Sequence, residues 1–138
     1  MTKPRPRLEK YEQADGVKLL GSLGARVYVL GTVRRRGDYQ GTMQTPGIPD
    51  VHAFLPPPKY GRDLPWGQTR RLLHWEVKSD TGRPSPAQDE YRVLCQLAGV
   101  WHVTGNLNAL LAALVQQGYL RADQLTIQRQ AVIEVTPP

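Results

Sequence analysis

The sequence of 138 residues contains one cysteine, Cys95, which excludes an internal disulfide and any zinc site built from several cysteines. It has no apolar run near the ~20 residues that a membrane-spanning helix needs, and its first residues lack the pattern of a signal peptide. We find no internal repeat and no low-complexity tract. These absences argue against a disulfide-stabilised secreted domain and a membrane protein, and they predict an intracellular, cytoplasmic location.

What the sequence does contain fits one globular domain with a hydrophobic core. Hydrophobic residues make up 40% and charged residues 22%, as is usual for such a domain. The formal net charge is +6. Because basic side chains on nucleic acid release condensed counterions, this excess favours a polyanionic partner such as DNA.

Hydrophobic periodicity predicts an α/β fold in which a small mixed sheet is flanked by helices. We expect a basic arm at 1–7, a domain at 8–120 and an extension at 121–138 that alternates enough for a β-hairpin. The predicted helices cover 8–23, 86–98 and 106–117. On the first of them one apolar arc is predicted, with Glu12 near its middle and Glu9 towards its edge; its members are Leu8, Tyr11, Leu19, Leu20 and Leu23. The predicted strands cover 25–33, 49–55, 71–78 and 100–103.

The start of the second predicted helix has a strong local signal. Ser85 suits the N-cap, Pro86 the first helical position and Gln88 the third, which together form a capping box. Cys95 falls on the same helical stripe as Tyr91, which predicts a buried free thiol.

Three residues point to chemistry at one end of the predicted sheet. Pro49-Asp50 begins the second strand, and Glu76 and Lys78 end the third on one face, with Val77 turned to the core. Two carboxylates and a lysine can hold a divalent cation against a phosphodiester and generate a nucleophilic water. The pattern therefore predicts a nuclease site, although an ion pair between Glu76 and Lys78 at a strand end would look the same if taken alone.

Two histidines, His52 and His74, alternate onto the face that carries Asp50 and Glu76. A lone histidine in such a place is more often a hydrogen-bonded neighbour than a metal ligand. We therefore leave both outside the catalytic set.

Several arginines are candidate phosphate contacts, although charge runs are often only solvated. A loop at 56–70 is too long for a tight turn, and its aromatic residues Tyr60 and Trp66 could stack on bases. A solvated insertion with one aromatic residue tucked down explains the loop equally well. The predicted DNA contacts are Arg34, Arg35, Arg36, Arg62, Arg70 and Arg83.

The order of elements, αβββαβα, resembles the restriction-endonuclease-like core, with Pro49-Asp50 and Glu76-Val77-Lys78 where the PD-(D/E)XK motif lies. Four features resemble one branch, the VRR-NUC family, over most of the chain. They are Glu12 in the first helix, Thr45-Pro46-Gly47-Ile48-Pro49-Asp50, Glu76-Val77-Lys78, and Gly82-Arg83-Pro84-Ser85-Pro86-Ala87-Gln88.

The resemblance implies a Mg²⁺- or Mn²⁺-dependent endonuclease that acts on branched DNA, with small homodimers that cut four-way junctions. Asp50, Glu76 and the main-chain carbonyl of Val77 would hold the metal, and Lys78 would orient or deprotonate the attacking water. Glu12 would hold a metal-bound water or a second ion, although Glu9 competes with it for that place. Gln88 would contact the water, a metal ligand or the phosphate, besides its part in the capping box. The long loop between the motif strands departs from the family pattern.

Other functions remain open from the sequence. Within the enzyme class the alternative is a flap or replication-fork nuclease. Outside that class it is a non-catalytic DNA-binding module of a phage or repair complex, or a subunit of a larger restriction or recombination machine.

Overall fold

The computed structural model describes residues 7–30, 47–60, 70–127 and 133–135. The helices and strands follow the predicted order αβββαβα, and a short 3-10 helix, η1, and two strands come after them. In chain order the elements are α1 (Glu9–Ser22), β1 (Arg26–Val29), β2 (Val51–Phe54), β3 (Leu72–Val77), α2 (Pro86–Ala98), β4 (Trp101–Gly105), α3 (Leu107–Gln116), η1 (Ala122–Gln124), β5 (Leu125–Ile127) and β6 (Ile133–Val135).

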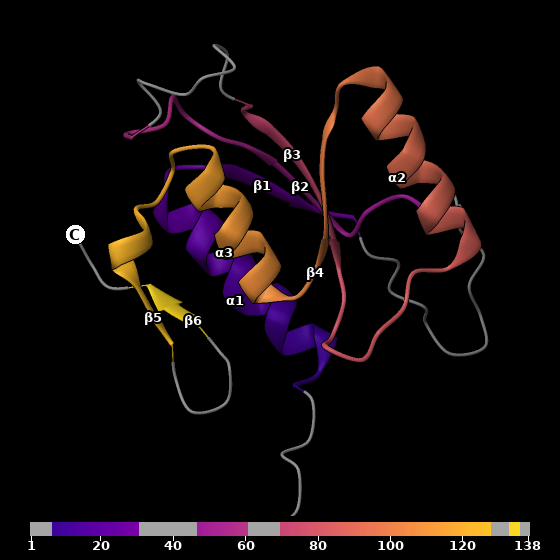
Figure 1. Ribbon diagram of the computed structural model, residues 1–138, viewed down its shortest axis with the longest axis horizontal. Helices are drawn as coiled ribbons and strands as arrows, with labels where there is room; N and C mark the ends of the chain where they lie inside the picture. The colour runs from indigo at the N-terminus through magenta and orange to yellow at the C-terminus, as the bar shows by residue number, and fades with distance from the viewer. Residues whose placement is uncertain (1–6, 31–46, 61–69, 128–132, 136–138) are drawn as a thin grey trace, which may run out of the picture.

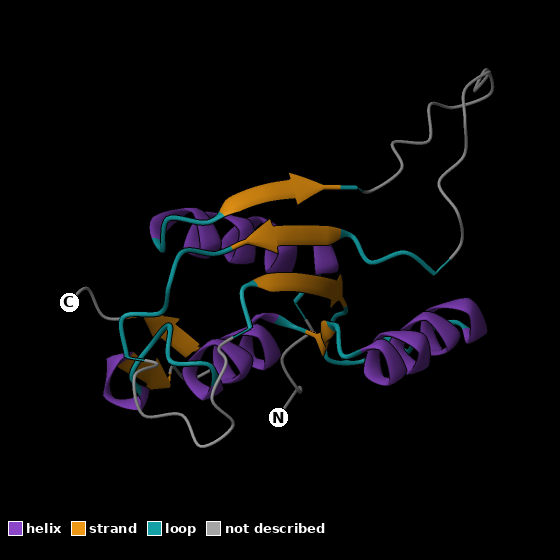
Figure 2. Ribbon diagram, turned by 90° about the horizontal axis from the view of Figure 1, so that it is seen from above, coloured by secondary structure: helices purple, strands orange, loops and turns teal. Residues whose placement is uncertain are grey.

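The four central strands form one mixed sheet in the order β1-β2-β3-β4. The β1–β2 and β2–β3 pairs are antiparallel, and β3 and β4 are parallel because α2 forms the crossover between them. Figure 1 shows α1 and α3 on one side of β4 and α2 on the other. Figure 2 shows β1, β2 and β3 side by side as the sheet is seen from above. The predicted α/β class is confirmed.

The ends of the chain were predicted less fully than its centre. The predicted C-terminal hairpin is present, because β5 and β6 pair antiparallel, but η1 was not predicted. Residues 1–6 of the predicted arm and the last three residues of the strand predicted at 25–33 lie outside the described residues. No helix in the described part of the chain is long and apolar enough to cross a bilayer.

One face of the sheet carries the hydrophobic core. Alternate residues of β2 and β3 point to α1 and α3 and are fully buried, as the strand pattern predicts. They pack with leucines of both helices in one cluster. The largest of these side chains is Trp75, whose Nε1 donates to the Gly105 carbonyl at 3.1 Å. Its indole is thereby satisfied as well as buried.

Gly16 lets α1 approach the sheet closely. A Cβ at this position would stand 2.2 Å from two ring carbons of Trp75, so no larger residue fits without movement of the helix. Glu12, Gly16 and Leu20 are the buried residues of α1 and are spaced four apart, so they form one line along the helix. Tyr11, predicted on the apolar arc, lies off this line and is 50% exposed, so that part of the prediction is wrong.

Gly47 brings the start of β2 against α2. Its φ is +90°, a value that favours glycine, and a Cβ there would be 2.4 Å from the Ala87 carbonyl oxygen. The turn that leads into Asp50 therefore lies directly beside the first turn of α2. This contact sets the positions of Asp50 and Gln88 at the same end of the sheet.

Candidate active site

Asp50, Glu76 and Lys78 converge at one end of β2 and β3. Asp50 lies one residue before the paired residues Val51 and Trp75, so it falls beside Glu76 on the neighbouring strand. The Asp50 Oδ2 accepts a hydrogen bond from the main-chain N–H of Val77 at 3.3 Å. The Nζ of Lys78 is 3.7 Å from Glu76 Oε1. The sheet register thus brings together the three side chains that the sequence singled out.

The two carboxyl groups affect each other's ionisation. Glu76 is only 2% exposed, and burial, followed by the charge of Asp50, raises its pKa to about 7. Lys78 opposes this shift. Burial also raises the pKa of Asp50, while the Val77 N–H and Lys78 act against it. Near neutral pH, Glu76 is therefore poised between its protonated and ionised forms, a state typical of functional sites.

The two oxygens of Glu76 have different surroundings. Oε1 accepts a hydrogen bond from Gln88 Nε2 at 2.5 Å and faces Lys78. Oε2 is buried and has no hydrogen-bond partner among the described residues. An unsatisfied buried oxygen is costly, so its presence calls for an explanation such as a bound ion.

Gln88 combines the two roles that the sequence left open. Its Oε1 accepts from the Ser85 N–H at 2.8 Å, and its own N–H donates to the Ser85 hydroxyl at 3.2 Å, so the capping box is formed. Its remaining amide nitrogen is the one that donates to Glu76. The capping box uses the side-chain oxygen and the contact with Glu76 uses the nitrogen, so the two interpretations are compatible.

The donor set fits a hard divalent cation held partly by solvent or substrate. Within the described ranges, no three His, Cys, Asp or Glu side chains are grouped to hold a metal. Asp50 and Glu76, with the unpaired Oε2, supply two carboxylates. Mg²⁺ is commonly bound by one or two carboxylates plus waters and substrate phosphates, so two carboxylates suffice. Histidine or thiol coordination is not needed.

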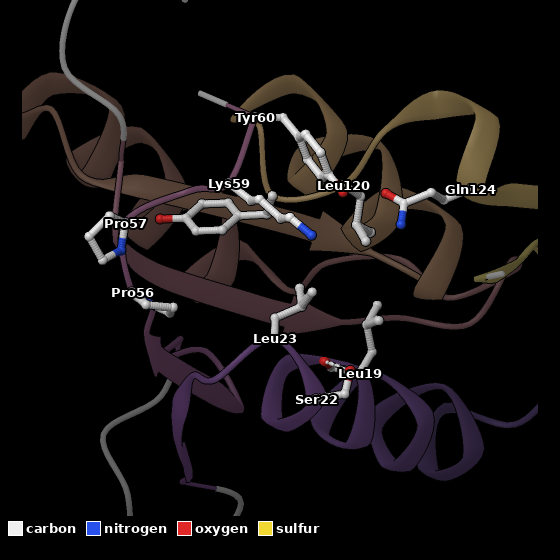
Figure 3. Close-up of a pocket in the computed structure, with 10 residues that line it drawn as sticks. Leu19, Ser22, Leu23, Pro56, Pro57, Lys59, Tyr60, Leu120 and Gln124 are labelled. Carbon is white, nitrogen blue, oxygen red and sulfur yellow. Dashed lines mark hydrogen bonds between the residues drawn. The ribbon is translucent and has the colours of Figure 1, made fainter. Parts of the chain in front are cut away.

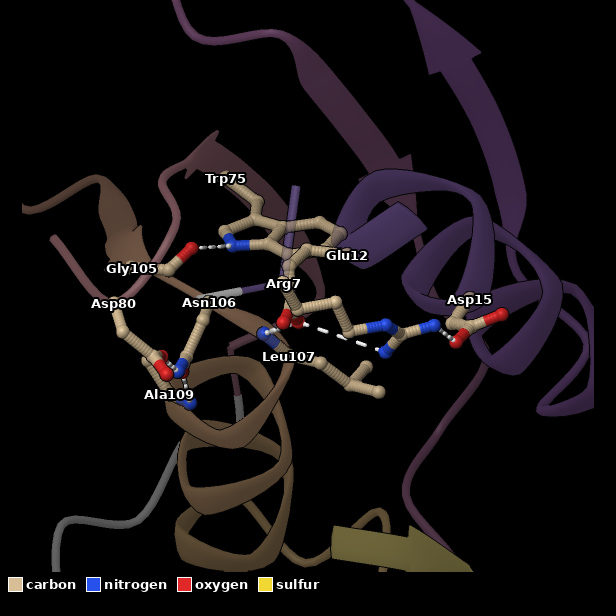
Figure 4. A network of polar contacts seen from close by, with 9 residues as sticks. All are labelled: Arg7, Glu12, Asp15, Trp75, Asp80, Gly105, Asn106, Leu107 and Ala109. Atoms are coloured by element: carbon tan, nitrogen blue, oxygen red, sulfur yellow. Dashed lines mark hydrogen bonds and ion pairs between the residues drawn. The ribbon is translucent and has the colours of Figure 1, made fainter. Parts of the chain in front are cut away.

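Glu12, on α1, places its carboxylate at the N-terminus of α3. It is 4% exposed, its Oε2 accepts from the Leu107 N–H at 2.8 Å, and Arg7 Nη1 is 4.0 Å away (Figure 4). Arg7 also pairs with Asp15. A carboxylate at a helix N-terminus satisfies a free N–H and interacts well with the helix dipole. This geometry explains the burial of Glu12 without a metal.

Glu9 is the glutamate of α1 whose charge acts on the site. Its carboxylate raises the pKa of Glu76. Its Oε1 also lies close to the turn after β3, 3.3 Å from where a Cβ on Gly82 would stand. Both glutamates therefore stay candidates for the first-helix acid. The carboxylate of Glu12 contacts the N-terminus of α3, and the charge of the exposed Glu9 adds to the raised pKa of Glu76.

The structure describes only two of the six arginines that were predicted to contact DNA. Arg34, Arg35, Arg36 and Arg62 lie outside the described residues. Arg70 precedes β3, at the end of the strand opposite Glu76, about 20 Å away at the usual rise per residue. Arg83 is exposed in the turn between Lys78 and α2, on the side of the site.

Two cavities lie at opposite ends of the sheet. One of about 330 Å³ is lined by Lys78 and by residues of the turn after β3 and the end of β4, such as Asp80 and Thr104. The other, about 480 Å³, lies between the end of α1 and Tyr60 and Tyr119, and its lining is mainly apolar (Figure 3). No carboxylate lines the second cavity, whereas Lys78 and Asp80 line the first.

His52 and His74 lie on the face that carries the carboxylates, as predicted. His74 Nδ1 is 3.0 Å from the Tyr91 hydroxyl, which makes it a hydrogen-bonded neighbour of the site. Cys95, one turn beyond Tyr91, is a buried free thiol, as expected from the sequence.

Comparison with known proteins gives one similarity of fold. No family model matches the sequence. No curated protein sequence matches it either. A solved structure described as "VRR_NUC domain" has 22% sequence identity and a TM-score of 0.49, over 80% of this chain and 97% of that one. The name is that of the family whose motifs the sequence resembles, but a likeness of this size does not establish an activity.

Proposed function

We propose that this protein is a divalent-metal-dependent endonuclease that hydrolyses phosphodiester bonds in branched DNA. The observation that carries the proposal is the convergence of Asp50, Glu76 and Lys78, with one buried Glu76 oxygen that has no partner in the described part of the chain. A pair of carboxylates beside an ammonium is the donor set that such hydrolysis needs. The net charge of +6 agrees with a polyanionic substrate.

Asp50, Glu76 Oε2 and the main-chain carbonyl of Val77 would hold the cation. When bound, Mg²⁺ or Mn²⁺ would supply a more acidic water and would offset charge on the phosphate. Gln88 fixes the orientation of Glu76 from the other side, through its hydrogen bond to Oε1. The Val77 N–H does the same for Asp50.

Lys78 is placed to act on the attacking water and the phosphate. Its ammonium lies beside Glu76 and lines the cavity at this end of the sheet. There it can orient the water and stabilise negative charge that builds on the phosphate oxygens. The water oxygen bonds to phosphorus, the bond from phosphorus to the 3′ oxygen breaks, and that oxygen takes up a proton. The products are a 5′-phosphate and a 3′-hydroxyl.

Among branched DNAs, the specific substrate is a four-way junction that a homodimer cuts, as the sequence resemblance implies. Two strands of a junction are cut in pairs only if two sites face them, which requires a two-fold assembly. Symmetric paired nicks would favour this assignment, and trimming of a single strand would favour a flap or fork nuclease.

Cleavage assays test the activity itself. Labelled linear, flapped and four-way DNA would be incubated with Mg²⁺, with Mn²⁺ and with EDTA. We expect metal-dependent cleavage in the wild type and its loss in Asp50→Asn, Glu76→Gln and Lys78→Met, while DNA binding is largely kept.

Matched controls separate the site from general loss of charge. Glu90 and Lys18 are exposed, so Glu90→Gln and Lys18→Met should cleave as the wild type does. Wild-type cleavage by Lys78→Met would remove Lys78 from the mechanism. DNA binding with no cleavage in any metal would instead indicate a non-catalytic DNA-binding module.

A further inference from the structure

On the α2 side of the sheet, two aromatic side chains are exposed. Tyr28 on β1 is 47% exposed and Phe54 on β2 is 53% exposed, and their rings meet edge to face with centroids 6.0 Å apart. Leu72, paired with Phe54 in the register, is 40% exposed. Large apolar side chains gathered on a surface usually mark a binding site.

Two histidines extend this surface towards the middle of the sheet. His52 is paired with Tyr28 on one side and with His74 on the other. The two imidazole rings stack in parallel, with centroids 4.0 Å apart and an interplanar angle of 11°. We call Tyr28, His52, Phe54 and Leu72 the open face.

The open face is continuous with the candidate active site. Asp50, His52 and Phe54 alternate along one strand, so they share one side of the sheet. At the usual rise they are spaced about 6.6 Å apart, and Phe54 lies about 13 Å from Asp50. Arg26 is exposed and paired with Phe54 in the register, so it places a cation beside the aromatic rings.

We propose that the open face stacks unpaired nucleotides that flank the scissile phosphate, with Tyr28 and Phe54 as the platform. This inference rests on the proposed function and narrows its substrate. The DNA would carry single-stranded nucleotides at the branch, as a flap or a fork does, so the inference favours that alternative over a four-way junction that is paired throughout. Exposed aromatic residues on a four-stranded sheet are a recurrent way to bind single strands, because every base has a face that can stack.

The observations favour nucleic acid over a second copy of the chain on this face. A cation, Arg26, accompanies the aromatic residues, and Asp50 of the proposed catalytic site lies on the same side of the sheet. A second copy seated on Phe54 would lie about 13 Å from Asp50, where the strand being cut must pass.

Binding assays in EDTA test the proposal without cleavage. The probes are a fully paired duplex and the same duplex with a single-stranded flap that carries 2-aminopurine next to the branch. Their affinity would be measured by fluorescence anisotropy, and stacking by quenching of the 2-aminopurine. The test variant is Tyr28→Leu with Phe54→Leu, which keeps apolar area but removes the rings. The control is Leu97→Ala, a change to an 80% exposed apolar residue on α2.

We expect the wild type to prefer the flapped probe and to quench its 2-aminopurine. The double variant should bind the flapped probe about fivefold or more weakly, lose the quenching, and bind the duplex as before, because one stacked base contributes ~1–3 kcal/mol. The Leu97→Ala protein should behave as the wild type.

Three results would overturn the proposal. They are equal loss of affinity for both probes, unchanged quenching in the double variant, and a dimer in light scattering that Phe54→Asp converts to a monomer. The last result would assign the open face to a protein interface. The proposed function is judged separately, by the cleavage that Glu76→Gln should abolish.

Discussion

The two faces of the sheet differ in almost every property. The face towards α1 and α3 is apolar, and its residues on β2 and β3 are all buried, with Trp75 the largest of them. The face towards α2 carries carboxylates, histidines and exposed aromatic rings. Residues next to each other in the sequence, such as Trp75 and Glu76, therefore contribute to different properties of the protein.

The difference shows how a small domain separates stability from chemistry. Burial of apolar area supplies most of the folding free energy, and here α1 and α3 provide it on one side only. The face towards α2 can then hold Glu76, whose pKa is raised to about 7. The core on the opposite face offsets the stability that this buried carboxylate costs.

An aromatic residue from each face gives the sharpest test of this separation. Trp75→Ala should lower the free energy of unfolding by about 3–5 kcal/mol, since it leaves a cavity under α1. Tyr28→Ala should lower it by less than about 1 kcal/mol, because Tyr28 is 47% exposed. Urea denaturation followed by far-ultraviolet circular dichroism measures both. Equal losses would mean that the open face contributes to the core.

The core face could be predicted from the sequence because it depends on local alternation. Leu73, Trp75 and Val77 repeat with period two, and burial of one face fixes the register of the strand. The placement of α1 against Trp75 could not be predicted, because it depends on the missing side chain of Gly16 and on a contact between residues far apart in the chain.

Replacement of the buried carboxylate of Glu76 should raise the free energy of unfolding, whereas Trp75→Ala and Tyr28→Ala should lower it. At pH 8 the folded protein holds Glu76 largely ionised, although its pKa of about 7 is raised above the ordinary 4.5. A raised acid pKa means that stability from this group falls as pH rises from 4.5 through 7. Glu76→Gln should therefore increase the free energy of unfolding at pH 8 by about 2–3 kcal/mol and should abolish cleavage.

The pH profile is the control for that prediction. The stabilisation by Glu76→Gln should disappear near pH 4.5, where both folded and unfolded wild-type protein are protonated at Glu76. Glu90→Gln, on the exposed side of α2, should change stability little at either pH. A variant less stable than the wild type at pH 8 would contradict the raised pKa.

The two glutamates of α1 should separate a structural role from a role in the site. Glu12→Ala removes the acceptor for the Leu107 N–H and should cost about 1–2 kcal/mol of stability. Glu9→Ala should leave stability nearly unchanged and should instead lower the pKa of Glu76, because it removes a neighbouring charge. Denaturation and the pH dependence of cleavage measure these effects. Loss of cleavage by folded Glu12→Ala, with Glu9→Ala unaffected, would assign the first-helix role in the site to Glu12.

The motif residues of the candidate site could be predicted from the sequence. The acidic residue that the first helix contributes could not. Asp50, Glu76 and Lys78 follow from strand alternation, which fixes the face each side chain takes. The choice between Glu9 and Glu12 depends on how α1 rotates against α3. A glutamate in the middle of an apolar stripe signals burial, and burial does not say whether its partner is a metal or a helix N-terminus.

Replacement of His74 should give the smallest change in stability, and this change should appear only at acidic pH. Burial, and then the charges of His52 and His102, lower the pKa of His74 to about 4. The folded protein keeps His74 neutral while the unfolded chain takes up a proton below about 6.5, so stability is lost as pH falls from 6.5 towards 4. His74→Phe removes this loss and keeps a ring to stack on His52. Relative to the wild type it should gain about 1 kcal/mol between pH 7 and pH 4.5, measured by denaturation at each pH. If the difference in stability between His74→Phe and the wild type stays constant from pH 7 to pH 4.5, His74 is as open to water as the aromatic residues beside it. The open face would then reach to the middle of the sheet.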